Sequence, residues 1–109
     1  MQNFIFISPN FPTNYWQFCR ELKNNGMNVL GIGDQPYDEL KPELKDSLNE
    51  YYKVGSLENY GEVYRAVAFF AFKYGRIDWL ESNNEYWLEQ DARLRTDFNI
   101  PSGFHNEDM

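Results

Sequence analysis

The chain has 109 residues and a formal net charge of −7, from 17 acidic and 10 basic side chains. This acidic balance disfavours nucleic acid and anionic membranes as partners, because binding to either one needs clustered Lys and Arg. Aromatic residues make up 18% of the chain, which argues against disorder and predicts one domain with a single core. The longest apolar run, 66–72, is far shorter than the ~20 residues of a membrane-spanning helix. One cysteine, Cys19, permits no intrachain disulfide, so we expect a cytoplasmic protein.

Four short apolar segments predict β-strands. The first, 4–7, is continuous and β-prone, as in a central parallel strand that is buried on both faces. The other strands are expected at residues 27–32, 51–54 and 77–80. Glycine or polar residues follow each segment, as they do where strands end.

Helical patterns lie between and after these strands. Thr13 is the expected N-cap of the first helix, and a short second helix is expected within 36–48, where leucines recur every four residues. Capping boxes at 59–62 and 82–85 open the third helix, which should end at Gly75, and the fourth, expected over 85–98. Phe69 and Phe72 widen the apolar stripe of the third helix, which is therefore expected to be the most buried.

The alternation of strands and helices predicts an α/β fold. We expect a three-layer open parallel four-stranded sheet, rudimentary Rossmann-like, with strand order 3-2-1-4. Such sheets bind ligands at the carboxyl ends of their strands, where the strand order reverses. In this order the loops after the first and fourth strands flank that crevice. Their polar side chains are the candidate site: Ser8, Asn10, Glu81, Asn83, Asn84 and Glu85.

The same residues also have a purely structural interpretation. Residues 8–10 have the composition of a turn, and 82–85 that of a helix cap. Glu81 and Glu85 form either a carboxylate pair for acid–base chemistry or a cap with a favourable charge at a helix N-terminus. For each residue taken singly, the structural interpretation is favoured.

The sequence lacks the residues that several common kinds of functional site require. A dinucleotide site needs a glycine-rich turn after the first strand, but residues 8–12 read SPNFP. Asp34 stands where a ribose-binding acid belongs, yet without that turn the signal is weak, and Gly31 and Gly33 favour close packing. The only histidine, His105, is distant in sequence from Cys19, so neither a metal site nor a Cys–His pair is expected.

Residues 79–100, WLESNNEYWLEQDARLRTDFNI, resemble the end of the N-terminal domain of ATP-grasp enzymes, with biotin-carboxylase-like and carbamoyl-phosphate-synthase-like members as the most similar. Residues 6–12 and 33–40 fit the same picture. The resemblance implies a pre-ATP-grasp domain at 1–100 and a loose tail at 101–109 that leads toward the ATP-grasp lobes.

In that family, ATP phosphorylates a carboxylate or bicarbonate, and ATP and magnesium are held by the later lobes. The resemblance therefore implies no catalytic, cofactor-binding or metal residue in this chain, and no activity of the chain alone. Its substrate-side candidates are Ser8, Asn10, Glu81, Asn83 and Glu85. The implied partners are the remaining lobes. A homodimer is also expected, through apolar surface around 9–11, Trp87 and Leu88.

The alternative is a free-standing small α/β module that binds a ligand or a partner without enzymatic activity. A receiver domain would need an acidic cluster after the first and third strands, where Ser8 and Gly55 stand instead. A flavodoxin-like protein would need a phosphate loop rich in Ser, Thr and Gly after the first strand, which is also missing.

Overall fold

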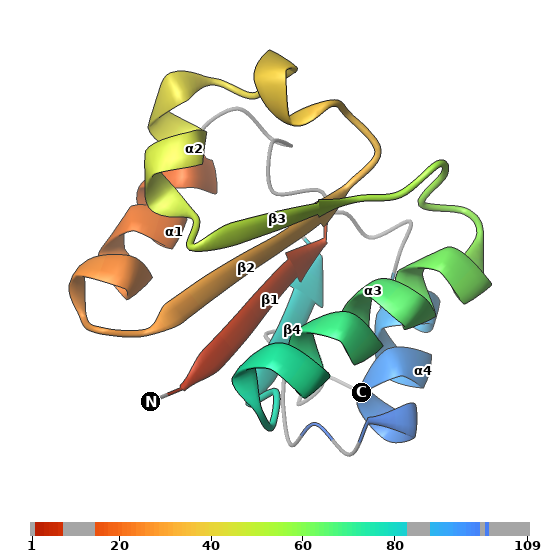
Figure 1. The fold of residues 1–109 in the computed structure, drawn as a ribbon. Coiled ribbons are helices and arrows are strands. Elements are labelled where there is room, and N and C mark those ends of the chain that lie inside the picture. The colour runs from red at the N-terminus through yellow and green to blue at the C-terminus, as the bar shows by residue number, and fades with distance from the viewer. Residues whose placement is uncertain (1, 8–14, 83–87, 99, 101–109) are drawn as a thin grey trace.

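β1 begins the chain's regular structure and lies at the centre of its sheet. A computed structural model describes residues 2–7, 15–82, 88–98 and 100 (Figure 1). The elements are β1 (Asn3–Ile7), α1 (Tyr15–Asn24), β2 (Asn28–Gly33), the 3-10 turn η1 (Tyr37–Glu39), α2 (Pro42–Ser47), β3 (Glu50–Lys53), α3 (Tyr60–Tyr74), β4 (Trp79–Ser82) and α4 (Leu88–Asp97). The predicted alternation of strands and helices is confirmed.

The four strands form one parallel sheet in the order β3-β2-β1-β4, as predicted. All five residues of β1 are buried, because the strand has a neighbour on each side and helices over both faces. In the register, Phe6 of β1 lies between Gly31 of β2 and Glu81 of β4. The continuous apolar run of the first strand is thus explained by its central position.

Helices cover both faces of the sheet, which gives the three predicted layers (Figure 1). On one face, Phe4 and Phe6 pack with Cys19 of α1 and Leu44 of α2. On the other face, the core is formed by residues of β1, β2, β4, α3 and α4 and by Val54 just after β3, among them Ile5, Leu30, Phe70, Leu80 and Leu94. The alternation along β1 explains this division, since successive side chains of a strand point to opposite faces.

The amino ends of the strands are joined by a polar network centred on Asn3, which is buried. Its side-chain amide donates to the carbonyls of Arg76 and Tyr74, at 2.7 and 3.1 Å. Its backbone N–H donates to the Asp78 carboxylate at 2.9 Å, and its side-chain oxygen accepts from Asn28 at 2.9 Å. These bonds satisfy a buried amide and fix the entry into β4.

Several predicted boundaries shift. β2 and β4 lie one or two residues later than expected, and β3 begins one residue earlier. The predicted second helix is confined to α2, because η1 and an extended Leu40 and Lys41 precede it. Pro42 occupies the first turn of α2, as expected, and Gly75, with a φ of 96°, ends α3.

The predicted capping box at the start of α3 is half right. The Asn59 side chain accepts from the backbone N–H of Glu62 at 3.2 Å. The Glu62 side chain does not return to the N–H of Asn59, which donates instead to the carbonyl of Ser56 at 3.1 Å. The Glu62 carboxylate accepts from the N–H groups of Gly55 and Ser56, at 3.3 and 3.2 Å.

The prediction that Phe69 and Phe72 widen the buried stripe of α3 is wrong. Phe69 is 39% exposed and Phe72 is 90% exposed. A helix that covers a sheet buries only one side, and in α3 Val63, Ala66, Val67 and Phe70 form that side. None of the helices within the described ranges has the length and apolar character needed to cross a bilayer.

Candidate functional site

The candidate site lies at the carboxyl ends of β1 and β4. The chain places β2 and β3 on one side of β1 and then returns to place β4 on the other side. The strand order therefore reverses between β1 and β4, which is where open α/β sheets bind their ligands. The last two residue pairs at this place are Phe6 with Glu81 and Ile7 with Ser82.

Glu81 is the described member of the predicted site, and its position differs from the expected one. It lies within β4 instead of after it, and it is only 1% exposed. The difference arises because β4 pairs with β1 from Trp79 onward, whereas Asp78 just before the strand accepts the N–H of Asn3. The other predicted site residues, Ser8, Asn10, Asn83, Asn84 and Glu85, lie outside the described residues.

The direction of the Glu81 side chain follows from its neighbours. Trp79 packs in the cluster beneath α1 and α2, with its ring stacked 5.3 Å from that of Phe4. Leu80 packs on the opposite face, in the cluster beneath α3 and α4. Glu81 therefore faces the α1 side of the sheet, in the same row as Trp79. Its place at the reversal of strand order makes it the principal candidate among the described residues.

Arg95 of α4 is a residue that sequence reasoning missed. Its guanidinium is buried and donates to the carbonyl of Leu80 at 2.8 Å, next to Glu81. In the sequence, Arg95 follows Asp91 by four residues, a spacing that favours an ion pair on the surface of a helix, and the side chain of Asp91 is outside the description. Nothing in the four-residue spacing distinguishes a surface arginine from one that anchors its helix to a strand. The bond fixes α4 to β4, next to Glu81.

The carboxyl end of β2 is filled by a tyrosine. A methyl group on Gly33 would lie 2.5 Å from the hydroxyl of Tyr51, which confirms that this glycine permits close packing. The Tyr51 hydroxyl donates to the carbonyl of Gln35 at 2.8 Å. Burial, with a smaller contribution from the Asp34 carboxylate, raises the pKa of Tyr51 to about 12. Asp34 itself is exposed.

The carboxyl end of β3 is also engaged within the chain. The N–H groups of Gly55 and Ser56 could receive an anion, but the Glu62 carboxylate already accepts from both. These donors therefore stabilise the start of α3. Among the described strand ends, this leaves the β1–β4 junction as the candidate for a ligand.

Within the described residues, neither the cysteine nor a group of metal-ligating side chains provides a reactive site. Cys19 is fully buried, and burial raises the pKa of its thiol to about 12, so it is a core residue, as predicted. Within the described ranges, no three His, Cys, Asp or Glu side chains gather closely enough to hold a metal ion.

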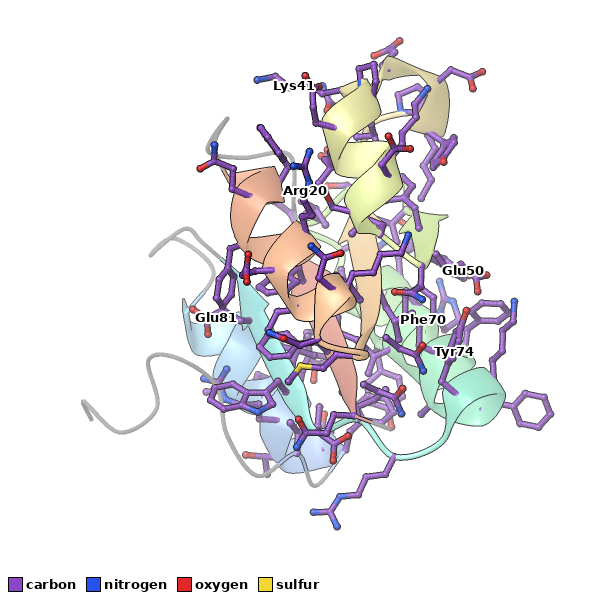
Figure 2. All side chains as sticks on the ribbon, turned by 90° about the vertical axis from the view of Figure 1, so that its left-hand side faces the viewer. Arg20, Lys41, Glu50, Phe70, Tyr74 and Glu81 are labelled. Carbon is purple, nitrogen blue, oxygen red and sulfur yellow. The ribbon has the colours of Figure 1, made fainter. Side chains whose placement is uncertain are left out.

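Figure 2 shows that Glu81 lies apart from the contact between α3 and β3. Glu81 lies at the left of that view, and Glu50, Phe70 and Tyr74 lie at the right. Glu50 accepts from Lys73 at 2.8 Å and from the hydroxyl of Tyr74 at 2.7 Å. These contacts tie α3 to the outer strand β3, away from the β1–β4 junction.

Two solved structures have similar folds. The L-amino acid ligase from Bacillus licheniformis has a TM-score of 0.66 and 15% identity, over 94% of this chain and 25% of that chain. The Cj0485 dehydrogenase has a TM-score of 0.61 and 23% identity, over 75% of this chain and 32% of that chain. The likeness shows the fold, and this chain spans about a quarter and a third of the two proteins. The sequence matches no protein-family model and no curated protein.

Proposed function

We propose that this chain is the N-terminal domain of an ATP-grasp carboxylate or bicarbonate ligase, of the biotin-carboxylase-like kind. Its role is to form a wall on the substrate side and to pack against the other lobes. The observation that carries the proposal is the common fold with an L-amino acid ligase over 94% of the chain. The resemblance of residues 79–100 to the family supports it, since this segment includes β4 and α4.

The chemistry of such ligases assigns a limited role to this domain. The terminal phosphoryl group of ATP passes to a carboxylate oxygen and ADP leaves. An amine or another nucleophile then attacks the acyl carbon, and phosphate leaves. Phosphoryl transfer requires cations and magnesium around the phosphates. At the β1–β4 junction the described residues offer a carboxyl group, Glu81, which suits a cationic or hydrogen-bonding part of a substrate better than a phosphate.

ATP and magnesium therefore belong, in this proposal, to the later lobes of the ligase, and the 109-residue chain is inactive alone. The dehydrogenase-like alternative is weaker, although the fold is shared. Residues 8–12 contain no glycine, so a pyrophosphate has no glycine-rich turn to approach. At the end of β2, where a ribose would lie, the Tyr51 ring packs against Gly33.

Two binding measurements on the 109-residue chain test the proposal. Calorimetry should show no binding of Mg-ATP or NAD. Ligand-observed NMR should show weak binding of L-amino acids, which is lost in Glu81→Gln. Asp34→Asn is the matched control, because Asp34 is an exposed carboxylate at another strand end, and it should leave the amino acid signal unchanged. Tight binding of either nucleotide would contradict the proposal.

The expected homodimer remains part of this proposal. Its surface, around 9–11, Trp87 and Leu88, belongs to the residues whose side chains are not described. Light scattering at high protein concentration should report a mass above that of one 13.0 kDa chain. A constant monomer mass would remove this part of the proposal and leave the assignment to a ligase domain intact.

A further inference from the structure

The turn between α1 and β2 contains the one Asn-Gly pair of the sequence, Asn25-Gly26. Gly26 has a φ of 88°, and its N–H donates to the carbonyl of Lys23 at 3.0 Å. The N–H of Met27 donates to the carbonyl of Leu22 at 3.2 Å. These two bonds and the left-handed glycine form the Schellman motif that ends α1. Because this position favours glycine, the Asn-Gly pair is part of how the helix ends.

The Asn25 side chain is less engaged than most asparagine side chains that the structure describes. Four of the others make hydrogen bonds to other residues, namely Asn3, Asn28, Asn49 and Asn59. The side chain of Asn25 is exposed and, among the described residues, makes no hydrogen bond. The same holds for Asn24, but the residue after Asn24 is another asparagine. Asn25 therefore combines a free side-chain amide with a glycine as its next residue.

We propose that Asn25 is a site of spontaneous deamidation by water. The backbone nitrogen of Gly26 attacks the side-chain carbon Cγ of Asn25 and gives up its proton. The new bond from this nitrogen to Cγ closes a succinimide ring, while the side-chain nitrogen leaves as ammonia with that proton. Water then breaks one of the two bonds between the ring nitrogen and the carbonyl carbons. The product is aspartate or isoaspartate, and in isoaspartate the backbone runs through Cγ.

The fold both slows and permits this reaction. The Gly26 N–H must leave the Lys23 carbonyl before its nitrogen can attack, so the folded chain should react more slowly than the unfolded chain. This opening costs little, since the end of a helix frays and both residues of the pair are exposed to water. Gly26 has no Cβ to hinder the approach, and a Cβ built there would meet no atom within 4 Å. The attacking nitrogen is therefore not crowded.

Both products weaken the end of α1. Aspartate adds a negative charge at the C-terminus of a helix, where the free carbonyls already favour positive charge. Isoaspartate adds a backbone carbon before Gly26, so the spacing that lets Gly26 and Met27 bond to α1 is lost. Met27 and Leu22 both pack against the core on the α1 side of the sheet, which carries the disturbance inward. The turn lies at the amino ends of the strands (Figure 1), so this inference does not rest on the proposed function.

Peptide mapping by mass spectrometry, with fragmentation that separates neighbouring sites, tests the proposal. The folded 109-residue chain is kept at mildly alkaline pH, which favours loss of the backbone proton, and is sampled over time. Deamidation at Asn25 should exceed that at Asn24 at least about tenfold, because only Asn25 precedes a glycine. Equal deamidation at the two sites would overturn the proposal. So would an unmodified Asn25 in the folded chain under conditions in which the urea-unfolded chain reacts.

Two variants and one stability measurement complete the test. Asn25→Gln lengthens the side chain and makes ring closure slower, so this turn should stay unmodified. Asn24→Gln is the matched control, and it should leave the deamidation of Asn25 unchanged. The isoaspartate form, isolated by ion exchange, should unfold at a lower urea concentration than the unmodified chain. An isoaspartate form as stable as the unmodified chain, or acidic forms that accumulate equally in Asn25→Gln, would contradict the proposal.

Discussion

The two ends of the sheet differ in how their polar groups are used. At the amino ends, Asn3 makes hydrogen bonds to Asn28, Asp78 and two carbonyls at the end of α3 and just after it, so its polar groups are satisfied within the fold. At the carboxyl ends of β1 and β4, a carboxyl group is buried where the strand order reverses. The first arrangement is what stability requires. The second lies where open α/β sheets bind their ligands, and it is therefore the candidate for function.

Removal of Asn3 should have the largest effect on stability. Asn3→Ala leaves the carbonyls of Arg76 and Tyr74 and the amide of Asn28 without their partner, and should lower the unfolding free energy by about 2–3 kcal/mol. Urea denaturation, followed by circular dichroism, measures this loss of unfolding free energy. Asn49→Ala is the control, because the Asn49 side-chain oxygen accepts one short bond, from Val29 N–H at 2.7 Å, and its amide reaches Asn28 only at 3.5 Å. Equal losses would show that the network around Asn3 has no special weight.

The packing at the end of β2 gives the next largest effect. Gly33→Ala places a methyl group against the Tyr51 hydroxyl and should cost about 1–2 kcal/mol. Tyr51→Phe removes the hydroxyl, after which the nearest ring atoms lie 3.2 Å from the new methyl group. The double variant should therefore be more stable than the sum of the two single changes predicts. Strict additivity in urea denaturation would mean that the two residues are not in contact.

A smaller effect is expected at the end of β3. Glu62→Ala removes the acceptor of the Gly55 and Ser56 N–H groups, which are exposed and can bind water instead. The expected loss is about 1 kcal/mol. Hydrogen exchange of these two amides should accelerate while that of Asn3 stays slow. Unchanged exchange at Gly55 and Ser56 would show that the carboxylate does not hold this loop in solution.

The smallest effect concerns pH. Burial alone would raise the pKa of Glu50, but hydrogen bonds from Lys73 and Tyr74, together with the Lys73 charge, bring it below its ordinary value of 4.5. A lowered carboxyl pKa stabilises the fold above pH 4.5, and this contribution is lost as the pH falls through the lowered value. The pair is partly exposed, so the contribution is at most about 0.5 kcal/mol. Glu50→Gln should reduce the dependence of stability on pH below 4.5, and an unchanged dependence would contradict the pairing.

The sequence was sufficient for the architecture because the strongest patterns are local. The apolar run at 4–7 predicts a central strand, and the turn residues and helical spacing around it predict the alternation of elements. The strand order also follows the prediction. Phe69 and Phe72 could not be placed, since α3 carries apolar residues on more than one side and their pattern does not reveal which side the sheet covers.

The candidate site was less predictable for a different reason. Glu81 was identified as a candidate, but its burial depends on a two-residue difference in where β4 begins, which local patterns do not fix. Arg95 was missed because its partner is the backbone carbonyl of Leu80 on another element. A bond to a backbone carbonyl leaves no complementary residue type in the sequence for a pattern to detect.

The difference between the two ends of the sheet can be measured most directly in one titration. Assigned ¹⁵N spectra of the chain are recorded while L-amino acids are added, with the Glu81→Gln variant in parallel. The account predicts shifts of the Phe6, Ile7 and Glu81 amides that are lost in the variant, and constant Asn3, Asn28 and Asp78 amides. Shifts centred on Asn3, or shifts that persist unchanged in Glu81→Gln, would contradict it.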